Sequence, residues 1–255
     1  MKAARFLREI NALSAAGAKT GFFYGLHPLA KLLVTVSFVV TLMSMDKYAF
    51  IPVLAMGSYP FLAFVMSGLS FKNCLTRIYP VLLMAGFVGL ANPFLDKQVI
   101  NIGQWQLGAG YVSFATLMLK GFWAVLASYV LITTSSVASL CYALRLLHVP
   151  KILVTQFLLT YRYLMLLVQE VENVSAAYAL RAPRQKGLNF KVWGSLVGHM
   201  LLRSMDRAEN IYASMVMRGF RGEIYYNSSG AVWNLRDWLF LLTSAAVFLL
   251  LRYCL

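Results

Sequence analysis

Charged residues are scarce in this chain, and acidic ones most of all. Only 13% of the 255 residues are charged, and nine Asp and Glu face 23 Lys and Arg, which gives a net charge of +14. Soluble domains are about 25% charged and about 45–50% apolar. With 60% hydrophobic residues, the composition argues against a water-soluble protein and predicts a membrane protein. The basic excess is then read as a sign of membrane orientation, and no nucleic-acid partner is expected.

Cysteine and histidine are also few and far apart. The cysteines are Cys74, Cys141 and Cys254, and the histidines are His27, His148 and His199. No pair has metal-site or CxxC spacing, so neither a disulfide framework nor a bound metal is expected. We place His148, which precedes Val149-Pro150, at a helix break, and His199 at a packed or interfacial position.

The chemistry of an enzyme is missing as well. Gly17-Ala18-Lys19-Thr20 resembles the end of a phosphate-binding loop, but Ala18 and Leu13 stand where that loop needs glycines. No Ser–His, Cys–His or carboxylate cluster is apparent. We therefore expect no catalytic residues, no metal ligands and no cofactor of the chain's own.

The N-terminal segment has no apolar run long enough for a cleavable signal. Residues 1–20 contain Lys2, Arg5, Arg8 and Lys19. Two interpretations stay open for this segment, an amphipathic helix on an anionic membrane surface or a frayed tail.

Five apolar segments are long enough to suggest membrane helices, which need about 20 residues to cross. They are Leu29–Met45, Ala49–Leu69 with Pro52 and Pro60 inside it, Tyr79–Leu95, Tyr111–Leu140 and Trp238–Tyr253.

Basic residues indicate the orientation of these segments. Lys72 and Arg77 lie on the same side as the basic N-terminus, whereas the opposite loops contain only Lys47 and Lys97, each beside an aspartate. The segment from Arg145 to Arg236 contains twelve Lys and Arg. The positive-inside rule therefore places the N-terminus and this segment in the cytoplasm.

A sixth apolar stretch, Ile152–Val168, passes the same hydropathy test but contains Gln156 and Arg162. A charge at a helix centre costs about 2.5–3.5 kcal/mol on insertion scales. We expect this stretch to lie in or under the cytoplasmic interface.

Two long amphipathic helices are predicted in the cytoplasmic segment, Lys151–Ala182 and Val192–Gly219, joined by the basic turn Pro183–Lys191. Each has an arginine in its last turn, in Leu180-Arg181-Ala182 and in Met217-Arg218-Gly219. A cation at that position stabilises a helix by about 0.3–1 kcal/mol, so the arginines have a purely structural explanation. Alternatively, they bind carboxylates or carbonyls of a partner.

These arginine-tipped ends resemble the paired arginine signatures of the transmembrane T component of energy-coupling factor (ECF) transporters. His27-Pro28-Leu29-Ala30-Lys31-Leu32 resembles that family's Asp-Pro-Arg-x-Lys-Leu, and Asn92-Pro93-Phe94 resembles its Asn-Pro motif. Val149-Pro150-Lys151, Tyr161-Arg162-Tyr163 and Glu170 are similar to the cobalt branch, CbiQ. The chain departs from the pattern at His27 and Leu29, and the first signature reads Leu-Arg-Ala in place of Ala-Arg-Gly.

The resemblance implies an all-α, L-shaped, polytopic protein of the bacterial cytoplasmic membrane. Its parts would be residues 1–140, with an N-terminal amphipathic helix and four membrane helices, the coupling helices 141–235, and a membrane helix 236–255.

The implied role is a coupling scaffold for cobalt uptake, which passes the motion of partner ATPases to a substrate-binding membrane subunit. The ATPases would bind the ATP and contact this chain at Leu180, Arg181, Ala182, Met217, Arg218 and Gly219.

Other functions remain open. The cargo of such a transporter could be nickel or a vitamin, because the resemblance assigns substrate choice to another subunit. An integral-membrane enzyme would need a catalytic cluster that the sequence lacks. A channel or membrane anchor would leave the two arginine-tipped helix ends unexplained.

Overall fold

The computed structural model describes residues 23–91, 99–102, 105–183, 190–222 and 233–254. The regular structure in these ranges is helical, as predicted, apart from one short hairpin. Its antiparallel strands, β1 (Val99–Ile102) and β2 (Trp105–Gly108), were not predicted. The predicted helix over residues 1–20, the Gly17–Thr20 segment and Asn92-Pro93-Phe94 lie outside the described residues.

The chain divides into two compact units, with boundaries after Ala143 and after Ser228. We call them the bundle, which includes the described residues 23–143 and 233–254, and the coupling unit, which includes residues 144–222 of the described chain.

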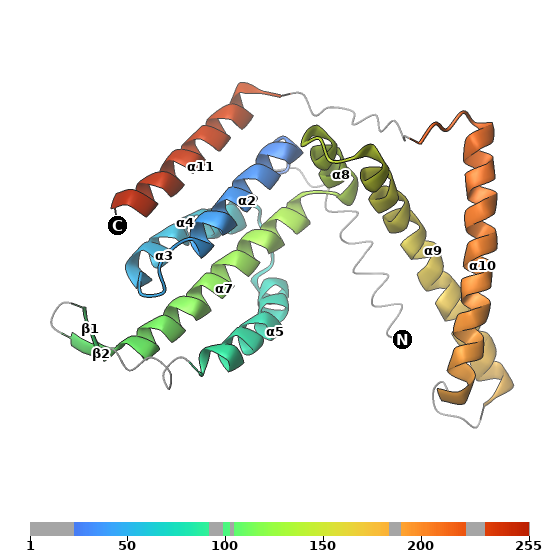
Figure 1. Cartoon of the computed structure of the whole chain (residues 1–255), viewed down its shortest axis with the longest axis horizontal. Coiled ribbons are helices and arrows are strands. Elements are labelled where there is room, and N and C mark those ends of the chain that lie inside the picture. Colours follow the sequence, from blue (N-terminus) through green and yellow to red (C-terminus); the bar gives the residue numbers. More distant parts are fainter. Residues whose placement is uncertain (1–22, 92–98, 103–104, 184–189, 223–232, 255) are drawn as a thin grey trace. The chain divides into compact units, whose positions relative to one another are not determined.

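A central helix organises the bundle. This helix, α7 (Ala109–Thr134), contacts four others, and α11 (Leu235–Cys254) packs on two of those four (Figure 1). The four neighbours of α7 are α2 (Pro28–Met43), α3 (Phe50–Met56), α4 (Ser58–Met66) and α5 (Phe71–Gly89). Of these, α2 and α3 are the two against which α11 packs most extensively.

Apolar side chains from these helices form the core of the bundle. One cluster joins α2, α3, α7 and α11 through Phe38, Met56, Ala127 and Phe248. A second cluster joins α5 to α7 through Ile78 and other residues.

Several helices of the bundle begin or end at other residues than the predicted segments. The predicted Ala49–Leu69 is two helices that meet at Gly57, and the third predicted segment is α5, which begins at Phe71 rather than at Tyr79. The predicted Tyr111–Leu140 ends at Thr134, and a separate helix, α8 (Val137–Leu146), follows. The break has a local cause, because the Ser136 hydroxyl accepts the backbone N–H of Ser139 at 3.2 Å and caps α8.

Close approach of helices in the bundle depends on glycine. A Cβ on Gly57 would lie 2.1 Å from the Trp123 indole, and one on Gly86 would lie 2.7 Å from the Met118 methyl group. Small residues at such positions let membrane helices approach closely, where packing rather than water drives association. Glycine therefore permits α7 to contact both the α3–α4 junction and α5.

Two buried charged side chains, Asp237 and Lys31, bind the backbone at the ends of three bundle helices. The Asp237 carboxylate accepts the backbone N–H of His27 at 2.8 Å and that of Asn234 at 3.0 Å, so it serves the starts of both α2 and α11. The Lys31 ammonium donates to the carbonyl of Thr134, at the end of α7, at 3.3 Å. All three helix ends carry orphan backbone groups that need such partners.

His27 caps a helix although the family that the sequence resembles has aspartate at this position. Its Nδ1 accepts the N–H of Leu29 at 3.2 Å, and its ring stacks on Trp233 at 4.6 Å between centroids. A carboxylate at the same position would accept the same N–H, so the two side chains are equivalent as helix caps.

The coupling unit consists mainly of two long helices, α9 (Lys151–Arg181) and α10 (Phe190–Met217), within two residues of the predicted limits. They follow a helix break at His148, as predicted. His148 has a left-handed φ of 60°, and its neighbour Val149 donates its N–H to the Leu144 carbonyl at 3.3 Å.

By length and composition, two helices of the described chain could each cross a membrane alone, and these are α7 and α9. The apolar α2, the α3–α4 pair and α5 are shorter. The five spans and the interfacial position of Ile152–Val168 therefore stay predictions.

Candidate functional site: the arginine-tipped helix pair

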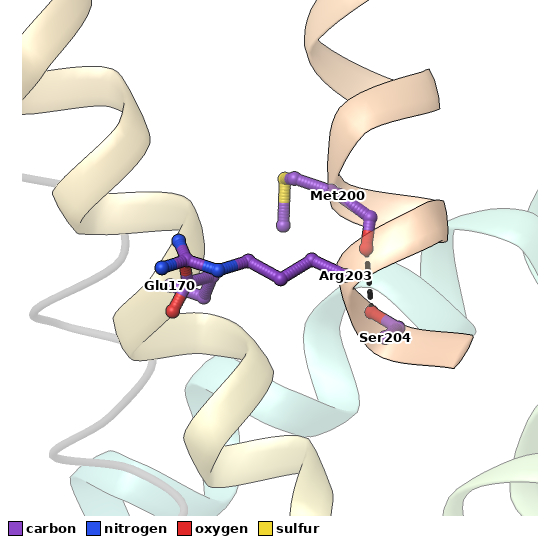
Figure 2. Close-up of polar contacts among 4 residues, drawn as sticks. All are labelled: Glu170, Met200, Arg203 and Ser204. Carbon is purple, nitrogen blue, oxygen red and sulfur yellow. Dashed lines mark hydrogen bonds and ion pairs between the residues drawn. The ribbon is translucent and has the colours of Figure 1, made fainter. Parts of the chain in front are cut away.

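The two helices of the coupling unit run antiparallel. Arg203 of α10 forms an ion pair with Glu170 of α9, and Ser204 beside it donates to the Met200 carbonyl at 2.7 Å (Figure 2). Farther along, Tyr163 of α9 faces the same cavity as Met215 of α10. Later residues of α10 thus meet earlier residues of α9.

The antiparallel arrangement places the two predicted arginine tips at opposite ends of the pair. Arg181 ends α9 close in sequence to the start of α10, whereas Arg218 follows the last residue of α10. At 1.5 Å per residue, the 28 residues of α10 separate the tips by about 42 Å. The tips do not come together into one site.

Both tips expose an apolar side chain beside the arginine. Leu180 is 84% exposed and Met217 is 89% exposed, and both arginines are exposed as well. An exposed apolar residue next to a guanidinium is the composition of an interface core, where arginine is enriched. Each tip is therefore suited to a partner that offers an acidic group beside an apolar surface.

The two tips end their helices by different means, although their sequences look alike. At the second, Gly219 has a φ of +83°, and Phe220 donates its N–H to the Met215 carbonyl at 3.0 Å, which is the Schellman arrangement. At the first, Ala182 has a φ of −127° and donates to the Tyr178 carbonyl at 3.0 Å before Pro183. The two ends therefore share a sequence pattern but differ in the backbone geometry of their C-caps.

Arg218 has neighbours that the sequence did not reveal. It lines a cavity of about 990 Å³ between α9 and α10 together with four other arginines, Arg162, Arg203, Arg207 and Arg221. Arg203, Arg207, Arg218 and Arg221 lie on α10 or directly after it, and the pairing of the two helices adds Arg162 of α9.

No metal site emerges from the described residues, which contain no group of three His, Cys, Asp or Glu close enough to hold an ion. Likewise, α9 and α10 bury no side chain within their described parts. The coupling unit thus offers surfaces for contact, and the comparisons with known proteins give these surfaces a context.

Residues 22–227 match the family model described as cobalt transport protein, CbiQ. The match covers most of the chain. The chain belongs to the CbiQ family. CbiQ proteins are transporter components, and this agrees with the long apolar helices α7 and α9, so the chain is a membrane protein.

Individual relatives are more distant. The chain is 32% identical over 117 residues to the nickel permease LarQ of Lactiplantibacillus plantarum, which is 46% of this chain and 42% of that protein. An uncharacterized protein of Methanocaldococcus jannaschii is 30% identical over 92 residues, 36% of this chain and 34% of the relative. A second uncharacterized protein from that organism is 29% identical over 111 residues, which is 43% of this chain and 38% of the relative. The matches thus span less than half of each curated relative.

Proposed function

We propose that this CbiQ-family chain is the transmembrane T component of an ATP-driven metal-uptake transporter of the ECF type. In this role it is a scaffold without catalysis of its own. ATPase subunits bind ATP and contact the arginine tips, and a separate membrane subunit binds the metal. The chain lies in the cytoplasmic membrane with its N-terminus and coupling unit inside the cell.

The observation that carries this proposal is the placement of two exposed arginine tips at opposite ends of one helix pair. Tips about 42 Å apart are suited to two separate contacts, one with each member of an ATPase pair. A change in the distance between the ATPases then applies force at both ends of the same helix pair. Each helix transmits such a displacement along its length because its backbone hydrogen bonds hold every turn to the next.

The tips also have the chemistry that docking needs. A planar guanidinium binds a carboxylate through two parallel hydrogen bonds, and the apolar Leu180 or Met217 beside it supplies area that water leaves on binding. A helix cap alone would not require these apolar neighbours to be exposed.

The test is affinity purification of the chain from its own membrane with measurement of ATPase activity. We expect an ATPase to co-purify with the wild type and to be lost from Arg181→Glu/Arg218→Glu. Arg236→Glu/Arg252→Glu is the matched control, because it makes the same charge change at exposed positions of α11. Equal ATPase recovery from both double variants would contradict the coupling role and leave the tips as helix caps.

The proposed cargo is cobalt, with nickel as the second candidate because one relative is named a nickel permease. Uptake of radioactive cobalt and nickel by cells that express the chain with its neighbouring subunits separates them. Flux of either ion through the chain alone would instead favour a channel.

A further inference from the structure

A second feature of the coupling unit is a cleft between α9 and α10 with two chemically different walls. The cavity of about 990 Å³ that contains Arg218 adjoins another of about 450 Å³. The two cavities share six lining residues, Leu159, Tyr163, Arg207, Ile211, Met215 and Phe220. We refer to them together as the interhelical cleft, with an arginine side and an apolar side.

The arginine side has a large excess of positive charge. Among the described residues, its five arginines face the carboxylate of Asp206, and Glu170 pairs with one of them, Arg203, which leaves three positive charges in excess. Within the described part of the chain, the other four arginines form no ion pair. A cluster of unpaired guanidinium groups attracts an anion, and phosphate suits their fork-shaped donors.

As far as the structure describes the chain, the apolar side carries no charged residue besides the shared Arg207. Apart from the shared residues, it is lined by apolar side chains and by uncharged polar ones, which are Ile152, Leu166, Leu167, Ala208 and Tyr212, and Thr155, Gln156, Thr160 and Ser204. Ile152 is 74% exposed, which leaves much apolar surface in water unless something covers it. The cleft is therefore complementary to a ligand with an anionic end and an apolar end.

The α9 wall of the cleft indicates where such a ligand comes from. Its residues run from Ile152 to Leu167, within the part of α9 that is apolar enough to enter a bilayer. Basic pockets between helices on the cytoplasmic side of a membrane are sites for phospholipid headgroups. An acidic protein segment would satisfy the arginines but would not need the apolar side.

We propose that the interhelical cleft binds an anionic phospholipid, with its phosphate on Arg162 and Arg207 and an acyl chain in the apolar side. Such a lipid fills the space between two helices that bury none of their described side chains. It would fasten the helix pair to the inner leaflet and stiffen it between its two tips.

The experiment uses the full chain in nanodiscs that contain phosphatidylglycerol and phosphatidylcholine with the same acyl chains. After release into a neutral detergent, native mass spectrometry counts the lipids retained. We expect preferential retention of phosphatidylglycerol. Each basic residue near an anionic lipid contributes roughly a fivefold factor in affinity, so Arg162→Gln/Arg207→Gln should weaken retention about 25-fold.

Three matched variants make the result specific. Arg236→Gln/Arg252→Gln removes the same charge from α11 and should retain the lipid. Arg162→Lys/Arg207→Lys keeps the charge and should keep the preference for phosphatidylglycerol. Leu166→Glu puts a carboxylate into the apolar side and should lower retention although every arginine is present.

Several outcomes would overturn the proposal. These are equal retention of the two lipids, unchanged retention by Arg162→Gln/Arg207→Gln, and complete displacement by millimolar inorganic phosphate, which would show a phosphate site without an acyl part. Capture of an ATPase subunit, in place of lipid, by a photo-crosslinker at position 162 would also overturn it. Arg181 and Arg218 are unchanged in every variant, so the test is separate from that of the coupling role.

Discussion

The Asp237 carboxylate accepts the backbone N–H of His27 at 2.8 Å, across 210 positions of sequence. The same carboxylate accepts the N–H of Asn234 at the start of its own helix. Asp237 is only 2% exposed, so one buried charge caps two helices that begin side by side. This contact links α11, at the end of the chain, to the first helix of the bundle.

Loss of the Asp237 charge should therefore destabilise the bundle. Asp237→Asn leaves one of the two N–H groups facing an amide NH2, which cannot accept it, and gives the other a neutral acceptor. Hydrogen bonds to charged groups contribute roughly 1.5–3 kcal/mol. Thermal unfolding in detergent should show a lower midpoint for this variant than for Asp46→Asn, which alters an exposed aspartate. Equal midpoints would mean that Asp237 does not fasten the helices.

Substitutions at His27 should separate capping from stacking. His27→Asn and His27→Leu both remove the stacking on Trp233, but only asparagine can accept the Leu29 N–H. We expect the free energy of unfolding of the asparagine variant to be about 1 kcal/mol higher than that of the leucine variant. Chemical unfolding of the two variants side by side measures this difference, and its absence would rule out the cap.

The Gly57–Trp123 contact should tolerate no side chain. Gly57→Ala places a Cβ 2.1 Å from the indole, and the overpacking should cost about 1–3 kcal/mol. Gly121→Ala is the control, because its Cβ would lie 3.8 Å from the Ala85 Cβ, an ordinary contact. In thermal unfolding, Trp123→Leu should restore part of the stability lost in Gly57→Ala. A destabilised Gly121→Ala would show that the bundle resists any added methyl group.

Two glycines of the coupling unit should respond to alanine with opposite signs. Gly219 has a φ of +83°, where alanine costs about 1–2 kcal/mol, so Gly219→Ala should loosen the end of α10. Gly198 lies inside α10, and a Cβ added to it would meet no other atom within 4 Å, so Gly198→Ala should stabilise the helix by about 0.5–1 kcal/mol. Amide hydrogen exchange along α10 measures both changes. Unchanged exchange at the end of α10 in Gly219→Ala would contradict the Schellman end.

The two cysteines whose side chains the structure describes should react slowly in a thiol-labelling test. Cys74 and Cys141 are buried, and burial raises the pKa of the Cys141 thiol, so less thiolate is present at neutral pH. Maleimide should label Cys141 slowly in intact protein and quickly after unfolding.

A reporter fused after Gln185 tests the topology of the chain and should lie in the cytoplasm. An external reporter would mean that α9 crosses the membrane.

The sequence by itself determined the composition-dependent features of this protein. Low charge and long apolar runs gave the helical membrane class, and uninterrupted amphipathic patterns located α9 and α10 within two residues. His148 before Val149-Pro150 correctly marked a helix break. These features depend on local periodicity and on backbone chemistry within a few residues, both of which a sequence contains directly.

Only the tertiary structure decided how distant residues combine. It brought Asp237 to His27, placed Gly57 against Trp123, and gathered five arginines on one side of the interhelical cleft. It also placed Arg181 and Arg218 at opposite ends of one pair, although their sequence contexts are alike. Such relationships depend on which helix faces pack together, and this is set by side-chain shape across the whole fold rather than by any local pattern.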